Sequence, residues 1–174
     1  MDRFREVGTA SMGRRLSKVA VGGTFDKLHR GHIKLLLKAF KIGDTVIIGL
    51  TTDEMLGKAP KNHIIDSYES RRQELIAFLS SKGLVERATI IPLHDSYGTT
   101  LANGGLQALV VSKETENVAK EINLRRGEKG MKPLAIYVIN MVNADDSVPI
   151  NTMRIRRGEI DRDGHLIESN VDSN

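Results

Sequence analysis

Short apolar runs alternate with longer segments of helical period along this chain of 174 residues. Runs rich in β-branched and aliphatic residues predict five strands, at residues 19–23, 45–50, 88–93, 108–112 and 134–140. These runs are too uniformly apolar for strands with one face in water, so they are typical of central strands in a parallel sheet. The alternation predicts an α/β fold, a doubly wound five-stranded parallel sheet with helices on both faces.

The segments between the strands carry apolar residues at helical spacing. After the first strand, one helical face is formed by Ile33, Leu36, Leu37 and Phe40. This helix is expected to begin at residues 29–32 and to end at Gly43. A later helix is expected after Ser112, because Val118 and Ile122 are four positions apart and share one face.

Another helix is predicted to begin at Asp66, where Glu69 three positions later forms a capping box, and to end near Gly83. Its apolar face consists of Leu75, Ile76 and Leu79. Residues 95–105 fit either a short helix or a loop, because a glycine pair at their end suits both.

Polar, aperiodic residues at both ends bound one predicted domain. A single core is expected over residues 18–161, with mobile tails at 1–17 and 162–174. No apolar run approaches the length of a membrane span, and the first residues lack the apolar stretch of a signal peptide. Cysteine is absent, which agrees with a reducing compartment. A cytoplasmic protein without a membrane partner is therefore expected.

Charge and composition narrow the class of ligand. The net charge is +4 and the isoelectric point is near 9.4, which favours anionic ligands. Aromatic residues make up only 4% of the chain, so there are few platforms on which the bases of a single-stranded nucleic acid could stack. Small phosphorylated ligands are favoured over nucleic acid.

The first predicted strand leads into the sequence GGTFDKLHRGH at residues 22–32. Ligands of open α/β sheets bind beyond the carboxyl ends of the strands, where this stretch is expected to lie. Gly22 and Gly23 permit a close approach of phosphate and tolerate positive φ. Gly31 lets the loop turn into a helix whose free N–H groups attract an anion, and His29 and His32 would project near it.

A metal-binding role is one alternative for the two histidines. The remaining histidines, His63, His94 and His165, lie in separate segments without ligand-like spacing, so no metal site is expected. The Walker pattern and the dinucleotide-binding fingerprint are both missing. A role as polar residues at a helix start stays open for His29 and His32.

Three stretches carry a family resemblance. Residues 23–32, GTFDKLHRGH, resemble the HxGH signature of the nucleotidylyltransferase superfamily. Residues 150–156, INTMRIR, are similar to its ISSTxIR signature, with Met153 in place of a hydroxyl residue. VVSKET at 110–115 and INLRR at 122–126 resemble the phosphopantetheine adenylyltransferases of the archaeal and eukaryotic type. The resemblance covers residues 18–161.

This resemblance implies a Rossmann-like fold and a reaction. A phosphate oxygen of 4′-phosphopantetheine attacks the α-phosphorus of ATP, so that AMP is transferred, dephospho-coenzyme A forms and pyrophosphate leaves. Such transfer needs alignment and charge stabilisation more than a protein nucleophile. Mg²⁺ is expected with ATP, held mainly by phosphate oxygens and water, and Asp145 and Asp146 are interpreted as a solvated loop pair. The oligomeric state is expected to be a monomer or a small homo-oligomer.

The resemblance also implies roles for individual residues. The implied catalytic residues are Thr24, His29, His32, Lys58 and Lys61. The implied nucleotide-binding residues are Gly22, Gly23, Thr24, Phe25, Gly31, His32, Ser112, Asn151, Thr152, Arg154 and Arg156. The two lysines would meet the acceptor phosphate, although solvated loop lysines fit the sequence as well.

Several of these residues have a second interpretation. Arg154 and Arg156 would hold the β- and γ-phosphates after a cap at Asn151 or Thr152, or would form a solvated basic helix. Ser112 could border the ligand or cap the next helix. Asp26 is expected to fix the turn or a neighbouring basic group rather than to touch ATP.

Other functions share parts of this pattern. Nucleotidylyltransferases that act on glycerol phosphate, nicotinamide mononucleotide or FMN carry the same GTFDxLHxGH stretch, and the VVSKET stretch favours pantetheine. A non-catalytic nucleotide sensor or a basic RNA-binding module is the alternative from another class. Both histidines and the late arginine-rich motif favour an enzyme, because binding alone would not require transition-state donors.

Overall fold

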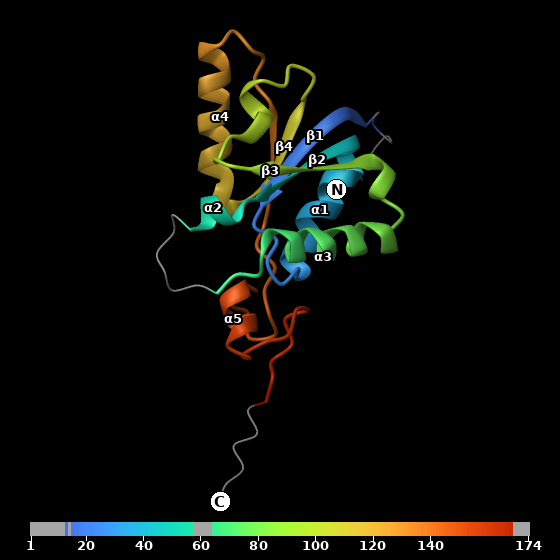
Figure 1. The fold of residues 1–174 in the computed structure, drawn as a ribbon, viewed down its shortest axis with the longest axis vertical. Helices are drawn as coiled ribbons and strands as arrows, with labels where there is room; N and C mark the ends of the chain where they lie inside the picture. The colour runs from blue at the N-terminus through green and yellow to red at the C-terminus, as the bar shows by residue number, and fades with distance from the viewer. Residues whose placement is uncertain (1–12, 14, 58–63, 169–174) are drawn as a thin grey trace, which may run out of the picture.

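The computed structural model describes residues 13, 15–57 and 64–168 and contains one parallel sheet (Figure 1). The strands are β1 (Leu16–Gly23), β2 (Gly43–Thr51), β3 (Ala88–Leu93), β4 (Ala108–Ser112) and β5 (Ala135–Ile139). Their order is β3-β2-β1-β4-β5, and all four neighbouring pairs are parallel. The direction of winding reverses between β1 and β4, which places the switch point of the doubly wound sheet at β1.

Helices cover both faces of the sheet, as the sequence predicts. One face carries α1 (Arg30–Ile42) and α3 (Tyr68–Ser81), and the other carries α4 (Glu116–Glu128), which Figure 1 shows on the opposite side. The short elements are α2 (Asp53–Leu56), α5 (Thr152–Arg156) and the 3₁₀ turns η1 (Val85–Arg87), η2 (Gly98–Leu101) and η3 (Lys113–Thr115). None of the described helices is long and apolar enough to cross a membrane.

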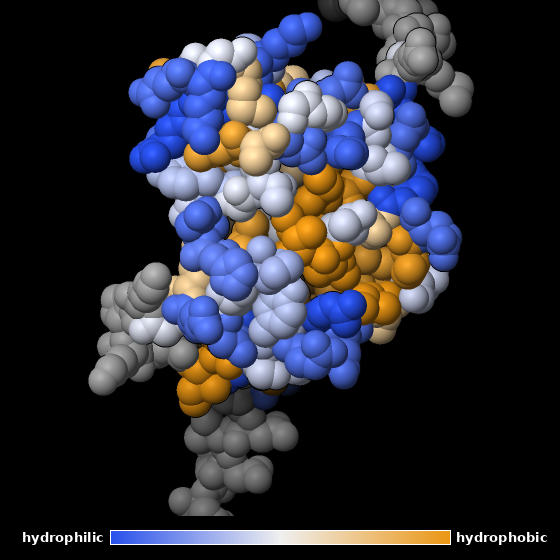
Figure 2. Space-filling model, turned by 45° about the horizontal axis from the view of Figure 1, so that its top comes forward, coloured by the Kyte–Doolittle hydropathy of each residue, from blue (hydrophilic) through white to orange (hydrophobic). Residues whose placement is uncertain are grey.

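The period-2 alternation of the strands divides the core into two parts. Val19 and Val21 of β1 point into the larger core under α1 and α3, where Leu36 of α1 is fully buried. Ala20 points the other way, toward Ile122 of α4. Truncating a buried leucine such as Leu36 to alanine typically costs about 2–5 kcal/mol, so α1 is fixed to the sheet by its apolar face. On the surface seen in Figure 2, the largest area of apolar residues is bordered by hydrophilic ones, and smaller apolar areas lie apart from it.

Two helix boundaries have physical causes other than those predicted. Gly43 ends α1, but its backbone is extended, with φ −113° and ψ 142°. A Cβ at this position would lie 2.6 Å from a methyl carbon of Val19, so close packing between strands is what requires glycine there. The predicted capping box at Asp66 is wrong: Ser67 caps α3 and accepts a hydrogen bond from Ser70 N at 3.2 Å.

The segment after β3 and the C-terminal segment are both hydrogen-bonded. Residues 98–101 form the turn η2, so the short-helix interpretation of residues 95–105 fits best. Beyond residue 161, Arg30 N donates to Arg162 O at 2.9 Å and Ile167 N donates to Glu159 O at 3.0 Å. The domain boundary at 161 stays a prediction, but this hydrogen bonding continues past it. The residues predicted as an N-terminal tail lie almost entirely outside the described part of the chain.

Candidate active site

Two cavities meet at the carboxyl end of β1. One, of about 330 Å³, is lined by His29, His32 and the start of α5, and is called here the histidine cavity. The other, of about 250 Å³, lies between the sheet and α4 and is called the apolar cavity. Both are lined by Gly22, Gly23, Thr24 and Thr115. A group held in one cavity can therefore meet a group held in the other at Thr24.

The two glycines of the motif are strand residues. Gly22 and Gly23 belong to β1, as predicted, and do not use the positive φ that glycine tolerates. Positive φ occurs instead at Phe25 and Lys27, each at 49°. The fully buried Phe25 ring meets the His32 ring edge to face, with centroids 5.4 Å apart. Packing of Phe25 in the core offsets the cost of its left-handed backbone and holds the loop beneath His32.

His29 and His32 stack on each other at the start of α1, with ring centroids 3.7 Å apart and planes inclined by 22°. His29 caps the helix, since its Nδ1 accepts a hydrogen bond from Gly31 N at 3.1 Å. Nδ1 of His32 accepts one from His29 N at 3.3 Å. Because both Nδ1 atoms act as acceptors, the hydrogen bonds assign the proton of each neutral ring to Nε2. Each histidine is left with one Nε2–H donor.

Burial keeps both rings uncharged. Burial, the nearby charge of Arg162 and an opposing effect of Asp26 together lower the pKa of His29 to about 4. Burial and the neighbouring His29 lower the pKa of His32 to about 3. Two neutral rings can stack without electrostatic repulsion, and at neutral pH they act as hydrogen-bond donors rather than as acids.

Gly31 makes room for this arrangement. A Cβ at residue 31 would lie 3.0 Å from Cε1 and 3.1 Å from Nδ1 of His29. Any larger residue would push the imidazole away from the helix start. Glycine is thus needed at position 31 because a side chain there would displace the His29 ring.

Thr24 is held at the junction of the cavities by two neighbours. Thr51 donates from its hydroxyl to Gly23 O at 2.9 Å, and this hydroxyl lies 3.1 Å from Thr24 Oγ1. Arg71 Nη1 donates to Thr24 O at 2.9 Å. The backbone and the hydroxyl of Thr24 are therefore fixed from opposite sides.

Arg71 is a residue that sequence reasoning missed. It is 1% exposed and donates to Asp66 O and to the carboxylate of Asp53, each at 2.8 Å. A backbone hydrogen bond from Tyr68 and the ion pair with Arg71 lower the pKa of Asp53. Arg71 thus joins the loop after β1, the first residue of α2 and the segment that leads into α3. In the sequence it lies in ESRR, which resembles a solvated charge run.

The second motif forms α5 and faces the histidine cavity with its first residues. Asn151 caps the helix and accepts from Arg154 N at 3.0 Å, so one of the two predicted caps is confirmed. Thr152 donates from its hydroxyl to Asp26 O at 3.1 Å. Asn151 and Thr152 line the histidine cavity together with the HxGH loop. The two sequence motifs, which lie at opposite ends of the chain, are thus brought together in one site.

The arginines of α5 bind carboxylates. Arg156 pairs with Asp26 and, at 3.3 Å, with Asp66, which confirms that Asp26 fixes a neighbouring basic group. Arg154 pairs with Asp146 and Glu159, so Asp146 is exposed, as predicted, and also ion-paired. These guanidinium groups do not line the histidine cavity, and their phosphate role stays a prediction.

Ser112 and the two lysines complete the set of predicted residues. Ser112 lines the histidine cavity and precedes η3, but its side chain makes no capping hydrogen bond. Its hydroxyl lies 3.4 Å from that of Thr115. Lys58 and Lys61 lie outside the described residues, in the segment between Gly57 and Ile64.

The arrangement agrees with comparisons to known proteins. The cytidylyltransferase-like family profile matches residues 20–158. The phosphopantetheine adenylyltransferase of Methanothermobacter thermautotrophicus is 48% identical over 157 residues, which cover 90% of this chain and 93% of that protein. The chain belongs to the cytidylyltransferase-like family. The resemblance to phosphopantetheine adenylyltransferases inferred from the sequence is confirmed.

Another relative and two solved structures are also similar to this chain. The phosphopantetheine adenylyltransferase of Pyrococcus horikoshii is 43% identical over 152 residues, covering 87% of this chain and 96% of that protein. A crystal structure of a protein of unknown function from Archaeoglobus fulgidus is 34% identical with a TM-score of 0.63, covering 70% of this chain and 88% of that one. A bifunctional NMN adenylyltransferase/ADP ribose pyrophosphatase from Francisella tularensis, at 15% identity and a TM-score of 0.50, shares the fold alone over 71% of this chain and 38% of that one.

Proposed function

We propose that this protein transfers AMP from ATP to 4′-phosphopantetheine, giving dephospho-coenzyme A and pyrophosphate. The observation that carries the proposal is the pair of cavities that share Gly22, Gly23 and Thr24. A transfer between two bound substrates needs two sites whose contents touch at one point. The names of the relatives, phosphopantetheine adenylyltransferases at 42–48% identity, support this choice of substrates.

The histidine cavity suits the nucleotide. Its neutral histidines present Nε2–H donors, and Gly22 and Gly23 add a wall without side chains that a phosphate can approach closely. Asn151 and Thr152 bring polar groups from the other end of the chain. Donors fixed in a buried site stabilise developing charge without reorganising during the reaction.

The apolar cavity suits the acceptor. Aliphatic side chains such as Ile47, Leu93 and Val118 line it, together with hydroxyl-bearing residues such as Ser96 and Thr99. A pantetheine arm combines aliphatic segments with amide groups, so it needs both kinds of contact. Its phosphate would lie at the Thr24 end, against the α-phosphate of ATP.

The chemistry follows from this placement. An oxygen of the acceptor phosphate forms a bond to the α-phosphorus of ATP, and the bond from the α-phosphorus to the bridging oxygen breaks, so that pyrophosphate leaves with that electron pair. The attacking oxygen is already anionic, and no base is required. Histidines with pKa values of about 4 and 3 are weak bases but effective neutral donors. They would stabilise the phosphates while Thr24 orients the two reacting groups.

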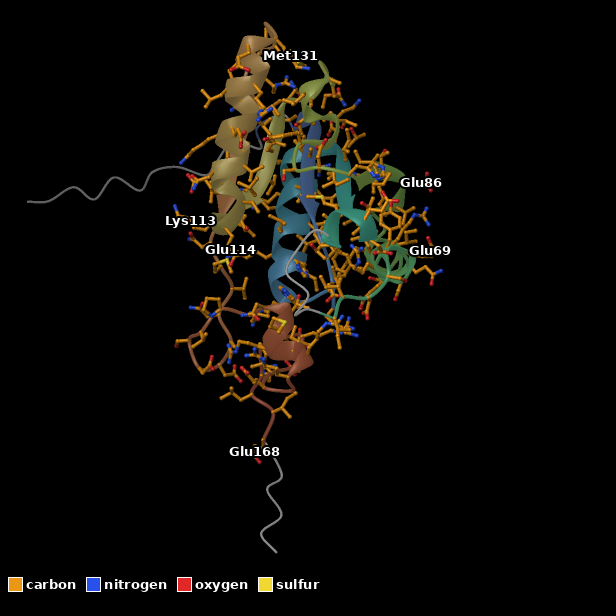
Figure 3. All side chains as sticks on the ribbon, turned by 60° about the vertical axis from the view of Figure 1, so that its left-hand side comes forward. Glu69, Glu86, Lys113, Glu114, Met131 and Glu168 are labelled. Carbon is orange, nitrogen blue, oxygen red and sulfur yellow. The ribbon has the colours of Figure 1, made fainter. Side chains whose placement is uncertain are left out.

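Mg²⁺ bound with ATP is part of the proposal. Across the part of the chain that the structure describes, no three His, Asp or Glu side chains gather as a metal site. Glu114 of η3 lines the histidine cavity, and Figure 3 shows it beside the end of α4 that is nearest α5. This lining would suit an ion held mainly by triphosphate oxygens and water, with the Glu114 carboxylate nearby. Bound in this way, Mg²⁺ would neutralise charge on the phosphates.

The test is a substrate matrix. ATP and CTP are each incubated with 4′-phosphopantetheine, glycerol 3-phosphate, nicotinamide mononucleotide and FMN, and pyrophosphate and the coupled product are measured. We expect turnover with ATP and 4′-phosphopantetheine, and a rate about a hundredfold lower for His32→Ala, since one fixed donor is lost. Turnover confined to another acceptor would contradict the proposal, and pyrophosphate release unaffected by His32→Ala would exclude the histidine mechanism.

We further propose that the protein works in the cytoplasm as a monomer or small homo-oligomer, without nucleic acid or membrane as partner. Sedimentation of the purified protein, alone and with RNA or lipid vesicles, tests the oligomeric state and the partners, and cell fractionation tests the location.

A further inference from the structure

One wall of the apolar cavity is a loop rather than a strand or a long helix. This segment, residues 95–103, is called here the wall loop, and it contains the 3₁₀ turn η2. Ser96, Tyr97, Thr99 and Thr100 of the wall loop line the cavity. The position of this loop therefore sets where hydroxyl groups lie in a cavity that is otherwise rich in aliphatic side chains.

The wall loop ends with backbone carbonyls that its own turn leaves without partners. Within the loop, Thr99 O accepts from the N–H groups of Ala102 and Asn103. Thr100 O and Asn103 O instead accept from Nη1 of Arg126, the second at 3.2 Å. Nε of the same guanidinium donates to Lys132 O at 2.9 Å. One side chain thus connects the wall loop to the segment that follows α4.

Arg126 is unusual in being buried without a carboxylate partner among the described residues. Only 1% of its surface is exposed, and its guanidinium donates to the backbone carbonyls of Thr100, Asn103 and Lys132. The preceding residue is bound differently: Arg125 pairs with Glu121 at 2.9 Å and lies over the ring of Tyr97 at 4.4 Å. Tyr97 in turn donates from its hydroxyl to Glu121 at 2.7 Å. Helix α4 therefore holds the wall loop at a buried point and at an exposed one.

We infer that Arg126 is a positioning residue for the acceptor substrate. It fixes the carbonyls of the wall loop, and through them the cavity-facing Thr99 and Thr100, while no described contact connects it to the histidine cavity. The inference rests on the proposed function, because it takes the apolar cavity to be the acceptor site. A guanidinium is suited to this task because its five N–H donors lie in a fixed planar fork, whereas an ammonium group is a compact charge at the end of a flexible chain.

The chain offers a matched control. Arg87 also donates to three backbone carbonyls, those of Phe40, Gly43 and Asp44, at 2.6–2.9 Å. These groups lie at the end of α1 and the start of β2, at the edge of the sheet opposite the cavities, and none of them lines either cavity. Loss of Arg87 removes the same kind of contact without touching the wall loop.

The experiment compares steady-state kinetics of Arg126→Met, Arg126→Lys and Arg87→Met with those of the wild type. We expect Arg126→Met to raise KM for 4′-phosphopantetheine at least tenfold while KM for ATP changes less than twofold. Arg126→Lys should give an intermediate KM, because an ammonium replaces part of the fork. Arg87→Met should leave both KM values near those of the wild type, even if its melting temperature falls.

Each other outcome has a defined meaning. An unchanged acceptor KM in Arg126→Met, an equal rise for ATP, or the same rise in Arg87→Met would overturn the inference. If Arg126→Met does not fold, Arg126→Lys and Glu121→Ala are used in its place, since both loosen the wall loop from α4 with smaller changes. The inference is overturned if neither of these two variants raises the acceptor KM. A wild-type protein inactive with 4′-phosphopantetheine would instead refute the proposed function.

Discussion

Arg156 and Asp26 are 130 positions apart in the sequence, and Nε and Nη2 of the arginine donate to the carboxylate at 2.9–3.1 Å. Asp26 is nearly fully buried, and its backbone carbonyl also accepts a hydrogen bond from Thr152. The HxGH loop and α5 are therefore joined by one residue. Any movement of α5 relative to the histidines would have to break this pair.

The first prediction concerns the stability of that junction. Arg156→Met leaves the buried Asp26 carboxylate without its cationic partner, so the free energy of unfolding should fall by about 3 kcal/mol. Arg157→Met, at a neighbouring side chain that is 64% exposed, should change it by less than about 0.5 kcal/mol. Urea denaturation followed by circular dichroism measures both. Equal losses in the two variants would show that the pair does not hold the fold.

A second prediction separates the structural role of Arg156 from a phosphate role. Because its guanidinium is engaged by Asp26 and Asp66, we expect Arg156→Met to weaken binding of ATP and AMP to a similar extent. Calorimetric titration with each nucleotide tests this. If ATP lost about tenfold more affinity than AMP, the arginine would have to leave Asp26 for the outer phosphates, as the resemblance implies.

A third prediction uses two helical glycines. Gly31→Ala places a Cβ 3.0 Å from the His29 ring and should lower the turnover rate at least tenfold without unfolding the protein. Gly127→Ala in α4 meets nothing within 4 Å and should stabilise the protein by up to about 1 kcal/mol with normal turnover. Rate assays and thermal melts distinguish them. Normal turnover in Gly31→Ala would mean that the ring position is not critical.

A fourth prediction follows from the pKa of about 3 for His32, which lies below the usual value of 6.5. Between these values the unfolded chain binds a proton that the native protein does not, so stability decreases as pH falls below 6.5. His32→Gln removes this proton uptake. Between pH 7.5 and 5 its free energy of unfolding should therefore fall by about 2 kcal/mol less than that of the wild type. His165→Gln, at a side chain that is 64% exposed, serves as control and should follow the wild type. Urea titrations at each pH give the values, and parallel curves for all three proteins would contradict the assignment.

The fifth prediction addresses the lysines outside the described residues. If one of Lys58 and Lys61 meets the acceptor phosphate, its change to alanine should raise KM for 4′-phosphopantetheine about tenfold or more, because a charge-assisted contact is lost. The other variant acts as the control. Unchanged acceptor kinetics in both would identify them as surface residues.

The features that could be predicted are those that the sequence encodes locally. Five apolar runs gave five strands, and the position of GTFDKLHRGH after the first strand located the histidine cavity. The cap of α3 was misplaced by one residue, because Asp66 and Ser67 are both good caps. Tertiary contacts decided between them: Asp66 pairs with Lys27 and Arg156 and leaves the cap to Ser67.

The features that could not be predicted depend on partners far away in the chain. Arg71 and Arg126 are the largest fully buried side chains, yet each lies in a charged stretch that suggests exposure. Their acceptors include carbonyls of residues 24, 66, 100 and 103, and every residue type carries a carbonyl. No residue pattern identifies such partners in a single sequence.

The wall of Gly22, Gly23 and Thr24 that both cavities share has a consequence for how this enzyme can change. A substitution in the wall affects the two substrates at once, so its effect cannot be assigned to either alone. Residues that line a single cavity are free of this constraint. The wall loop and the inner side of α4 can be rebuilt for a different acceptor while the stacked histidines stay as they are. Residues that line only the apolar cavity can thus be changed separately from those around the histidines, and engineering a new acceptor should begin at residues 96–100.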